Sequence, residues 1–464
     1  MTAPLDAVLA RLDSGREAAL DRLIALLKIP SISTDPAYAA ECARAADWLV
    51  ADLRSMGFAA ESRPTAGRPI VVAHDDSAPA GAPHVLFYGH YDVQPVDPLE
   101  LWETPPFEPR LAEGPKGRRI YARGASDDKG QVMTFLEACR SWKAQGGLPV
   151  RVTILIEGEE ESGGEHLPGF LRDNAEELRA DVALVCDTDM WNAETPSIGL
   201  SLRGLVGEEL RIKSAARDLH SGMYGGAARN PATALAKIIA GLHDEDGRVT
   251  LAGFYDDVPE PSAEIQASRA ALDFDESAFL GEVGLTAPAG EKGRSLLESI
   301  WSRPTCEING ISGGYAGAGF KTVLPAEAMA KISFRLVGDQ DPAKIRAAFR
   351  AYVKANLPPD CEAVFTEHGG SPGVSLPLES RWVSAAREAL GAEWGKPAAL
   401  VGSGGSIPVV GLLRKTIGVD TLLIGYALGD DSIHAPNEKY ELRSFEKGAR
   451  SWARVLARLA EPAA

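Results

Sequence analysis

The start of the chain carries hydrophobic side chains at steps of three and four residues, the spacing that places them on one face of a helix. One such stripe covers residues 4–29 and ends at Pro30, which cannot continue a helix. A second stripe covers residues 37–56, and Gly57 stands where a C-cap is expected. The pattern therefore predicts two N-terminal helices.

Further along the chain, the hydrophobic residues form continuous runs of strand length. These runs lie within residues 84–93, 150–157 and 181–187. Helical patterns at 129–143 and 166–178 separate them. Strands that are apolar throughout are buried on both faces, so this alternation predicts an α/β domain with a mostly parallel sheet flanked by helices. In such sheets, ligands bind at the carboxyl ends of the strands.

The middle of the chain has a different pattern, because residues 208–214 and 331–337 alternate between apolar and polar side chains. Alternation of this kind is typical of antiparallel strands with one exposed face. Helices are predicted to begin at Pro231 and Pro342, each preceded by a polar N-cap residue. The stretch 245–298 between these two strand-helix units is irregular and acidic, and we interpret it as loops and short helices.

The pattern of the first domain returns near the C-terminus, where we expect a helix, a strand and a final amphipathic helix. The chain of 464 residues also exceeds the size at which a single core stops growing. We therefore predict two domains. Residues 206–378 form an α+β domain with an antiparallel sheet, inserted between residues 1–205 and 379–464 of the α/β domain.

Composition and charge narrow the class of protein. The formal net charge of −17 argues against binding to nucleic acids or anionic membranes, since both require a basic surface. The five cysteines are scattered and form no Cys-x-x-Cys pair, which indicates a reducing compartment. The sequence shows no basic and apolar leader and no apolar stretch of about 18 residues. We therefore expect a cytoplasmic protein without a membrane segment.

Acidic and histidine-bearing segments follow several of the predicted strands or begin the helices between them. They are Gly89-His90-Tyr91-Asp92, Ser126-Asp127-Asp128, Glu159-Glu160-Glu161, Cys186-Asp187 and, near the C-terminus, Ile433-His434-Ala435. A two-metal hydrolytic site needs nitrogen and oxygen ligands, one bridging carboxylate and a free position for water. We interpret these segments together as such a ligand set.

Each position taken alone also has a structural explanation. His90 could supply an imidazole that Asp92, two residues further on the same strand face, orients, or the two could be a surface pair. Asp127 and Asp128 open a helix, where carboxylates act as caps, but the long loop before them favours Asp127 as the bridging ligand. A carboxylate at Asp187, after a buried strand, needs a cation, a metal or solvent.

The three successive glutamates also allow two interpretations, because solvated acidic runs are common. Here they follow an apolar strand and precede a turn at Ser162-Gly163-Gly164. One carboxylate could bind metal while its neighbour acts as a general base. Five other histidines, His74, His84, His166, His243 and His368, stand in no comparable setting.

Three motifs of the sequence are similar to those of a known peptidase family. They are Gly89-His90-Tyr91-Asp92-Val93-Gln94-Pro95, Arg123-Gly124-Ala125-Ser126-Asp127-Asp128-Lys129-Gly130 and Asp218-Leu219-His220-Ser221-Gly222-Met223-Tyr224-Gly225-Gly226. The chain resembles the co-catalytic zinc peptidases that include carnosine and other cytosolic dipeptidases, glutamate carboxypeptidase, aminoacylase and succinyl-diaminopimelate desuccinylase. The likeness runs from about residue 20 to the C-terminus, keeps the motif order and is especially close to the dipeptidase branch.

This resemblance implies a role for each candidate ligand. His90, Asp127 and Asp187 would bind one zinc ion, and Asp127, Glu161 and His434 the other, with Mn²⁺ or Co²⁺ as alternatives. Glu160 would be the general base, because Glu160-Glu161-Ser162-Gly163 aligns with the family's Glu-Glu-x-Gly motif. Asp92 would support His90 in catalysis.

Two details of the resemblance can be tested against a structure. Asp187 and Asp189 both stand near the family's ligand, and counting along the strand from Asp181 and back from Pro196 favours Asp187. The Asp127-Asp128 peptide bond is similar to one that is cis in the family.

The inserted domain would act as a lid and dimerisation domain. In relatives, the histidine equivalent to His220 reaches the active site of the partner subunit, where it stabilises an oxyanion and contacts the substrate, which implies a homodimer. A structural loop histidine is the alternative. Arg335, with Gly405 and Ser406 in a glycine-rich loop, resembles the dipeptidase grip on the substrate carboxylate, although such a loop alone is weak evidence.

The sequence thus predicts a dizinc metallopeptidase that hydrolyses dipeptides or similarly small peptides with a metal-bound hydroxide. Deacylation of N-acyl amino acids, as in aminoacylase-like relatives, is the alternative hydrolase. A non-catalytic, metal-stabilised scaffold would show gaps in the ligand set, and the sequence shows none.

Overall fold

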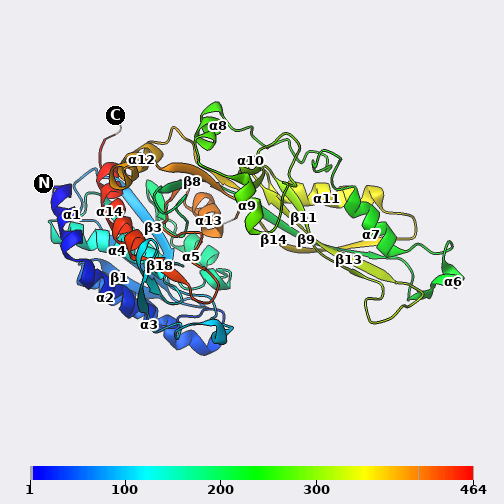
Figure 1. The fold of residues 1–464 in the computed structure, drawn as a ribbon, viewed down its shortest axis with the longest axis horizontal. Coiled ribbons are helices and arrows are strands. Elements are labelled where there is room, and N and C mark those ends of the chain that lie inside the picture. The colour runs from blue at the N-terminus through cyan, green and yellow to red at the C-terminus, as the bar shows by residue number, and fades with distance from the viewer. Residues whose placement is uncertain (1–3, 406, 463–464) are drawn as a thin grey trace. The chain divides into compact units, whose positions relative to one another are not determined.

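The computed structural model describes residues 4–405 and 407–462 of the chain. It divides into two compact units (Figure 1). Unit 1 comprises Met1–Leu200, Leu376–Val401 and Leu412–Ala464, and unit 2 comprises Ser201–Ser375 and Gly402–Gly411. The short segment Gly402–Gly411, which the sequence pattern placed in the first domain, is grouped with unit 2.

The centre of unit 1 is a sheet with the strand order β1-β2-β6-β3-β7-β17-β8. Its strands are β1 (Ala59–Arg63), β2 (Ile70–Asp75), β3 (His84–His90), β6 (Arg151–Glu157), β7 (Val182–Val185), β8 (Ser197–Leu202) and β17 (Thr421–Leu423). The four strands from β6 through β3 and β7 to β17 are parallel, as the apolar runs predict. The strands on either side of them pair antiparallel, which the sequence pattern did not show. Short strands β15 (Val374–Ser375) and β16 (Ala399–Ser403) pair with β8.

Helices pack around this sheet. They are α1 (Leu5–Ser14), α2 (Arg16–Leu27), α3 (Ala39–Ser55), α4 (Lys129–Ala144), α5 (Leu167–Asp173), α12 (Arg381–Trp394), α13 (Pro408–Thr416) and α14 (Leu442–Leu459), with 3-10 turns η1 (Pro36–Tyr38), η2 (Leu99–Leu101) and η3 (Glu160–Ser162). The predicted helix over residues 4–29 is in fact two helices, because Gly15, with ψ 4°, leaves the helical range. The first and last helices of the chain lie side by side, because α1 packs against α14 (Figure 1).

A three-stranded antiparallel sheet of unit 1 packs against α14. It consists of β4 (Arg110–Gly114), β5 (Gly117–Tyr121) and β18 (Lys439–Glu441), in the order β18-β5-β4. Tyr440 of β18 pairs with Ile120 of β5. This pairing brings the chain just before β18 next to the chain just after β5.

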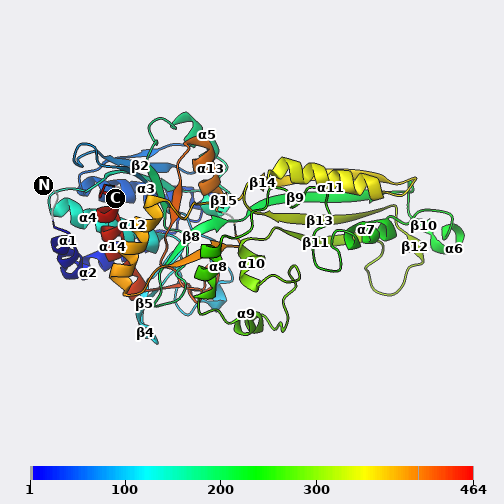
Figure 2. The ribbon, with the colours of Figure 1, turned by 90° about the horizontal axis from the view of Figure 1, so that it is seen from above.

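Unit 2 contains a four-stranded antiparallel sheet with the order β11-β13-β9-β14 (Figure 2). Its strands are β9 (Gly204–Lys213), β11 (Thr305–Gly313), β13 (Glu327–Leu336) and β14 (Glu362–Ser371), and a second pair is β10 (Leu219–His220) with β12 (Val323–Leu324). Its helices are α6 (Ser221–Tyr224), α7 (Pro231–Ala240), α8 (Ala263–Ala270), α9 (Glu276–Glu282), α10 (Leu296–Trp301) and α11 (Pro342–Asn356).

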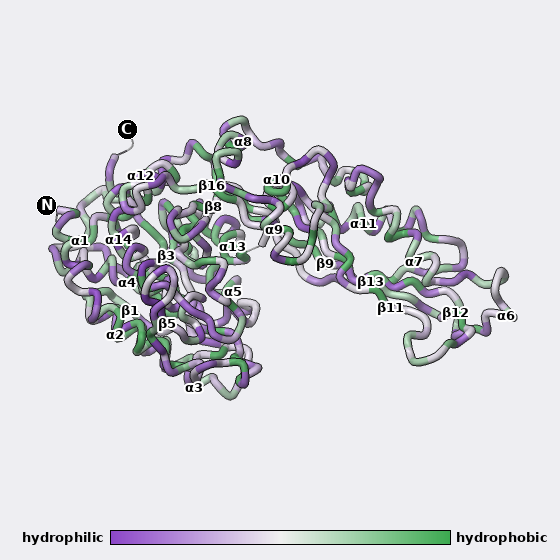
Figure 3. Tube along the Cα trace, viewed as in Figure 1, coloured by the Kyte–Doolittle hydropathy of each residue, from purple (hydrophilic) through white to green (hydrophobic). Residues whose placement is uncertain are grey.

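Burial alternates along β9 and β13, where hydrophobic and hydrophilic residues are interspersed (Figure 3). The buried residues of both strands share one core with α7 and α11, so the opposite face carries the polar residues, as predicted. Asn230 and Asp341 cap these helices, since their side chains accept hydrogen bonds from the amides of Ala232 and Ala343.

Within the described residues, no helix combines the length and the hydropathy that a membrane crossing requires.

Candidate metal centre

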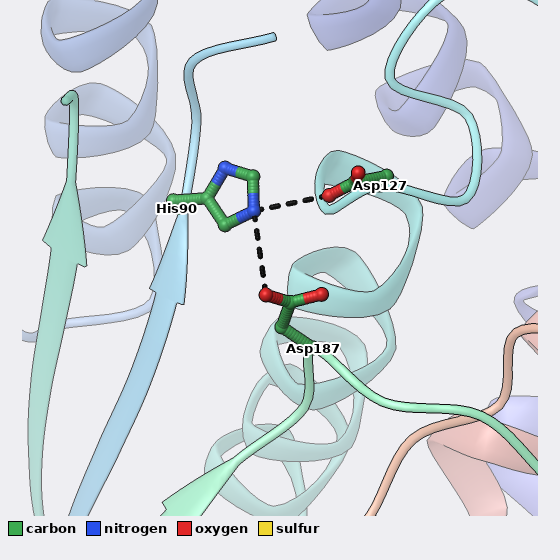
Figure 4. A group of neighbouring side chains, drawn as sticks. All are labelled: His90, Asp127 and Asp187. Carbon is green, nitrogen blue, oxygen red and sulfur yellow. Dashed lines mark ion pairs between the residues drawn. The ribbon is translucent and has the colours of Figure 1, made fainter. Parts of the chain in front are cut away.

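Three predicted ligands meet at the carboxyl edge of the parallel strands of unit 1 (Figure 4). His90 is the last residue of β3, Asp187 follows β7, and Asp127 lies just before α4. Tyr88 and Val185 are register partners in the neighbouring strands β3 and β7, so the residues that follow them reach the same edge of the sheet. His90 Nε2 lies 3.1 Å from Asp127 Oδ1 and 3.8 Å from Asp187 Oδ2.

A second group of ligands shares Asp127 with the first. His434 Nε2 lies 2.9 Å from Asp127 Oδ2 and 3.3 Å from Glu161 Oε2. In each group, one ligand atom of every residue lies within 4.8 Å of the others. Asp127 thus presents one carboxylate oxygen to each histidine and belongs to both groups. The structure brings together all five residues that the sequence suggested as ligands.

The donor set fits a metal ion on the chemistry of its atoms. His90 is fully buried, and its Nε2 has no hydrogen-bond partner among the described residues, although it faces two carboxylates. Burial, followed by the charges of Asp127 and Asp128, raises the pKa of Asp187 well above its ordinary value. Hydrogen bonds to Asp127 and Glu161 raise the pKa of His434 to about 10. Imidazole nitrogen and carboxylate oxygens that converge in this way are typical zinc ligands.

Asp92 connects the two groups of ligands. His90 Nδ1 lies 3.1 Å from the main-chain oxygen of Asp92 and 3.5 Å from its Oδ1. The carboxylate of Asp92 also accepts the amides of Glu160 at 3.3 Å and Glu161 at 3.0 Å. The sequence suggested Asp92 only as a partner of His90, whereas the structure shows that it also holds the turn with both glutamates.

The three successive glutamates point in different directions. Glu159 Oε2 lies 2.8 Å from His166 Nδ1, outside both groups, and Glu161 is the member that reaches His434. Burial, opposed by His90 but reinforced by Glu161 and Asp92, raises the pKa of Glu160 above its ordinary value. Glu160 is thus a buried carboxyl of raised pKa in the same short turn as the ligand Glu161.

Asp189, the alternative to Asp187, belongs to neither group of ligands within the described part of the chain. Its main-chain oxygen accepts the hydroxyl of Ser197 at 2.5 Å. The peptide bond Asp127-Asp128 is cis, as the resemblance implies. Asp128 is fully buried, and its Oδ2 accepts the amide of His90 at 3.1 Å.

Glycine at position 89 makes room for this contact. A Cβ at Gly89 would lie 2.4 Å from Val132 Cγ2 and 2.8 Å from Asp128 Oδ2. A larger residue at position 89 would therefore push His90 away from the other candidate ligands.

The other predicted site residues belong to unit 2, whereas both groups of ligands lie in unit 1. His220 is exposed, and its Nδ1 accepts the amide of Gly222 at 3.0 Å. Arg335 is half-buried on β13. The amide of Gly405 donates to the hydroxyl of Ser403 at 3.2 Å. Ser406 lies outside the described residues.

Sequence reasoning missed three polar residues beside the ligands. Gln94 Nε2 donates to Glu161 Oε2 at 2.6 Å. Glu438 and Asp431 are fully buried and accept hydrogen bonds from the loop that carries Asp127. Gln94 could have been found from its place in the motif that begins at Gly89. Asp431 and Glu438 could have been found from the acidic segment around His434, for which the sequence offered no other explanation.

Comparison with known proteins agrees with this geometry. The model of Peptidase family M20/M25/M40 matches residues 86–458. The chain is 29% identical to the Cys-Gly metallodipeptidase DUG1 of Candida albicans, over 97% of this chain and 96% of the relative. It is 27% identical to the Beta-Ala-His dipeptidase of Rattus norvegicus, over 85% of this chain and 80% of the relative.

A solved structure has the same fold over nearly the whole chain. It is described as an M20 family metallo-carboxypeptidase from Sulfolobus solfataricus, with a TM-score of 0.80, 32% sequence identity, and coverage of 95% of this chain and 99% of that one. The chain belongs to Peptidase family M20/M25/M40 and is an enzyme, a metal-dependent peptidase.

Proposed function

We propose that the protein is a dipeptidase that hydrolyses the amide bond of dipeptides or similarly small peptides. The observation that carries this proposal is the position of Asp127 between two groups of ligands, with Glu160 beside them. Two relatives named above are dipeptidases, and their names point to the different substrates Cys-Gly and β-Ala-His. The proposal therefore covers dipeptides as a class and does not specify which side chains of the substrate are preferred.

The centre would hold two Zn²⁺ ions, or Mn²⁺ or Co²⁺ in their place. His90, Asp127 and Asp187 would bind one ion, and Asp127, Glu161 and His434 the other. When bound, the ions would lower the pKa of a water molecule and polarise the scissile carbonyl. Asp92 would keep His90 and the turn of Glu161 in place for this.

Glu160 would take the proton from the attacking water and pass it to the leaving amine. Its position in the sequence, directly before Glu161, supports this role, because both side chains leave the same short turn. Its raised pKa supports the first half of the role, because a carboxylate with a higher pKa is a stronger base toward the proton of the water.

Residues of unit 2 would bind the other end of the substrate. Arg335, Gly405 and Ser406 would contact its terminal carboxylate through a guanidinium group and a glycine-rich loop. His220 would stabilise the oxyanion in the partner subunit of a homodimer, in which unit 2 serves as lid and dimerisation domain. The exposure of His220 in the single chain supports a role toward another molecule.

A cytoplasmic location is also part of the proposal. The cysteines of the chain are all free, which supports a reducing compartment.

A direct comparison of substrates would test the proposal. Metal-free protein would be reconstituted with Zn²⁺, Mn²⁺ or Co²⁺ and assayed on a dipeptide library, on tripeptides and on N-acetyl amino acids. We expect hydrolysis of dipeptides that is lost with a chelator and regained with metal. Turnover of N-acetyl amino acids alone would instead identify a deacylase, and preferred release of the C-terminal residue from longer peptides would identify a carboxypeptidase.

A further inference from the structure

Glu438 is fully buried next to Asp127 but belongs to neither group of ligands. Its Oε1 accepts the amides of Ser126 at 2.9 Å and Asp127 at 3.0 Å. Its Oε2 accepts the amide of Gly124 at 2.9 Å and Arg123 Nη1 at 2.8 Å. Both oxygens of Glu438 are thus fully occupied as acceptors, and three of the four donors are main-chain amides of the loop that ends at Asp127.

A second carboxylate joins the same loop to the segment of His434. Asp431 Oδ2 accepts the hydroxyl of Ser126 at 2.9 Å and the amide of Leu428 at 2.8 Å. Asp431 Oδ1 accepts Lys439 Nζ at 2.6 Å, and the amide of Lys439 donates to the main-chain oxygen of Asp431 at 2.9 Å. The two ends of the loop that carries His434 are therefore fastened to each other and to the loop of Asp127.

The loop of His434 requires such support, because its main chain is in a disfavoured conformation. Ser432, His434 and Asn437 have φ values of 56°, 60° and 64°, a region that residues other than glycine rarely adopt. Such residues persist only where their surroundings hold them. Asn437 contributes one more fastening, since its Oδ1 accepts the amide of Glu103 at 2.8 Å.

We propose that Glu438 is a positioning residue that sets the metal affinity of the centre by holding Asp127 at a fixed place relative to His434. The inference rests on the metal ligands of the proposed function. Asp127 is the ligand common to both groups, and Glu438 lies on the loop of His434, so one side chain controls the spacing of ligands that are far apart in sequence. Hydrogen-bonded partners behind metal ligands commonly change metal affinity by about 10- to 100-fold.

Glu393 offers a matched control, because it is another glutamate of unit 1, its side chain is only 4% exposed, and it has several basic partners. Its carboxylate accepts Arg450 Nε and Arg454 Nε, both at 2.9 Å, and Lys447 Nζ at 3.3 Å. These partners all lie on α14, and none belongs to a ligand-bearing loop. Its replacement removes a carboxylate with several hydrogen bonds to basic side chains without touching the centre.

The test compares zinc binding by the full chain and by its Glu438→Gln and Glu393→Gln variants, prepared metal-free and titrated against a chromophoric chelator. Glutamine would place an NH₂ group against two donors in the pocket of Glu438, so the loop must shift. We expect two ions in the parent chain, a 10- to 100-fold loss of zinc affinity in Glu438→Gln, and an unchanged affinity in Glu393→Gln. The rise in melting temperature on adding zinc should shrink in Glu438→Gln alone.

Equal zinc affinities of Glu438→Gln and the parent chain would overturn the inference. An equal loss in Glu393→Gln would also overturn it, because the effect would then come from general destabilisation. A parent chain that binds no pair of ions would contradict the proposed function instead.

If Glu438→Gln does not fold, Glu438→Asp provides a milder variant, because it keeps the carboxylate but withdraws it by one methylene from the amides of Gly124, Ser126 and Asp127. It should weaken zinc binding at least about fivefold, as expected for the loss of one hydrogen bond. An unchanged affinity in this variant would overturn the inference as well.

Discussion

The two groups of ligands are built in different ways. His90 and Asp187 follow neighbouring buried strands of one sheet, and the side chain of His90 is 0% exposed. His434 is 54% exposed and lies in a loop whose conformation is disfavoured. Half of the centre is therefore placed by the sheet, and the other half by side chains that fasten a loop. We expect the first group to be rigid, and we expect mutation or metal removal to affect the second group more easily.

The residue common to both halves should have the largest effect. Asp127→Ala removes one ligand from each group, so metal content should fall from two ions to nearly none and hydrolysis should fall on the order of 10⁴-fold, because the chemistry that the metals supply is lost. Metal analysis by mass spectrometry and a dipeptide assay measure these changes. A variant that keeps one tightly bound ion would show that Asp127 is not shared.

The proposed base should separate chemistry from metal binding. Glu160→Gln removes a proton acceptor but no ligand, so kcat should fall by about 10²- to 10⁴-fold while metal content stays at the parent value. Steady-state kinetics and metal analysis of the same preparation give both quantities. Glu159→Gln is the matched control, because Glu159 contacts His166 instead, and near-parent turnover is expected. Retained turnover in Glu160→Gln would remove it from the mechanism.

The first group can be tested at Asp187, for which Asp189 is the alternative ligand. Asp187→Asn should weaken binding of one ion by about 100-fold, since an amide is a poorer ligand than a carboxylate. Asp189→Asn should leave metal affinity within about twofold, because Asp189 belongs to neither group. Zinc titration of both variants decides between them, and the reverse order would transfer the role to Asp189.

The second group should be easier to empty than the first. His434→Asn should leave one ion bound and change the melting temperature of the metal-free protein by less than about 2 °C, because the side chain is exposed. His90→Asn instead removes a buried ligand of the first group. Stepwise titration of both variants with a chelator tests this expectation. It would be contradicted if the ion of the second group needed more chelator for its removal than the ion of the first group.

The smallest effect should be one of pH. In the metal-free protein, Asp127 and Glu161 raise the pKa of His434 to about 10, so at pH 7 a proton occupies the nitrogen that a metal needs. A metal that binds there must displace this proton, so affinity should rise with pH in this range. Calorimetry in buffers of different ionisation enthalpy counts the protons. His434→Asn should release about one proton fewer per molecule.

Local features of the sequence predicted much of the fold. The apolar runs identified β3, β6 and β7, and the N-cap and proline pairs located the beginnings of α7 and α11. The antiparallel strands β1, β2 and β8 were missed. β1 is a partly exposed edge strand without a continuous apolar run, whereas β2 and β8 are buried along most of their length but are not part of the alternation of strands with helices. The break at Gly15 was missed as well, since the hydrophobic stripe that stops at Leu12 resumes in the same phase at Ala19 and Leu20.

The sequence by itself determined which side chains could form the centre. The reason is that the residue type of each ligand, its place after a strand and the order of the motifs can all be read along the chain. Only the tertiary structure decided how they combine: that Asp127 lies between two histidines, that Asp92 holds the turn of the glutamates, and that Glu438 joins two loops. The reason is that these contacts depend on pairings between distant segments, such as β5 with β18, whose register no local pattern specifies.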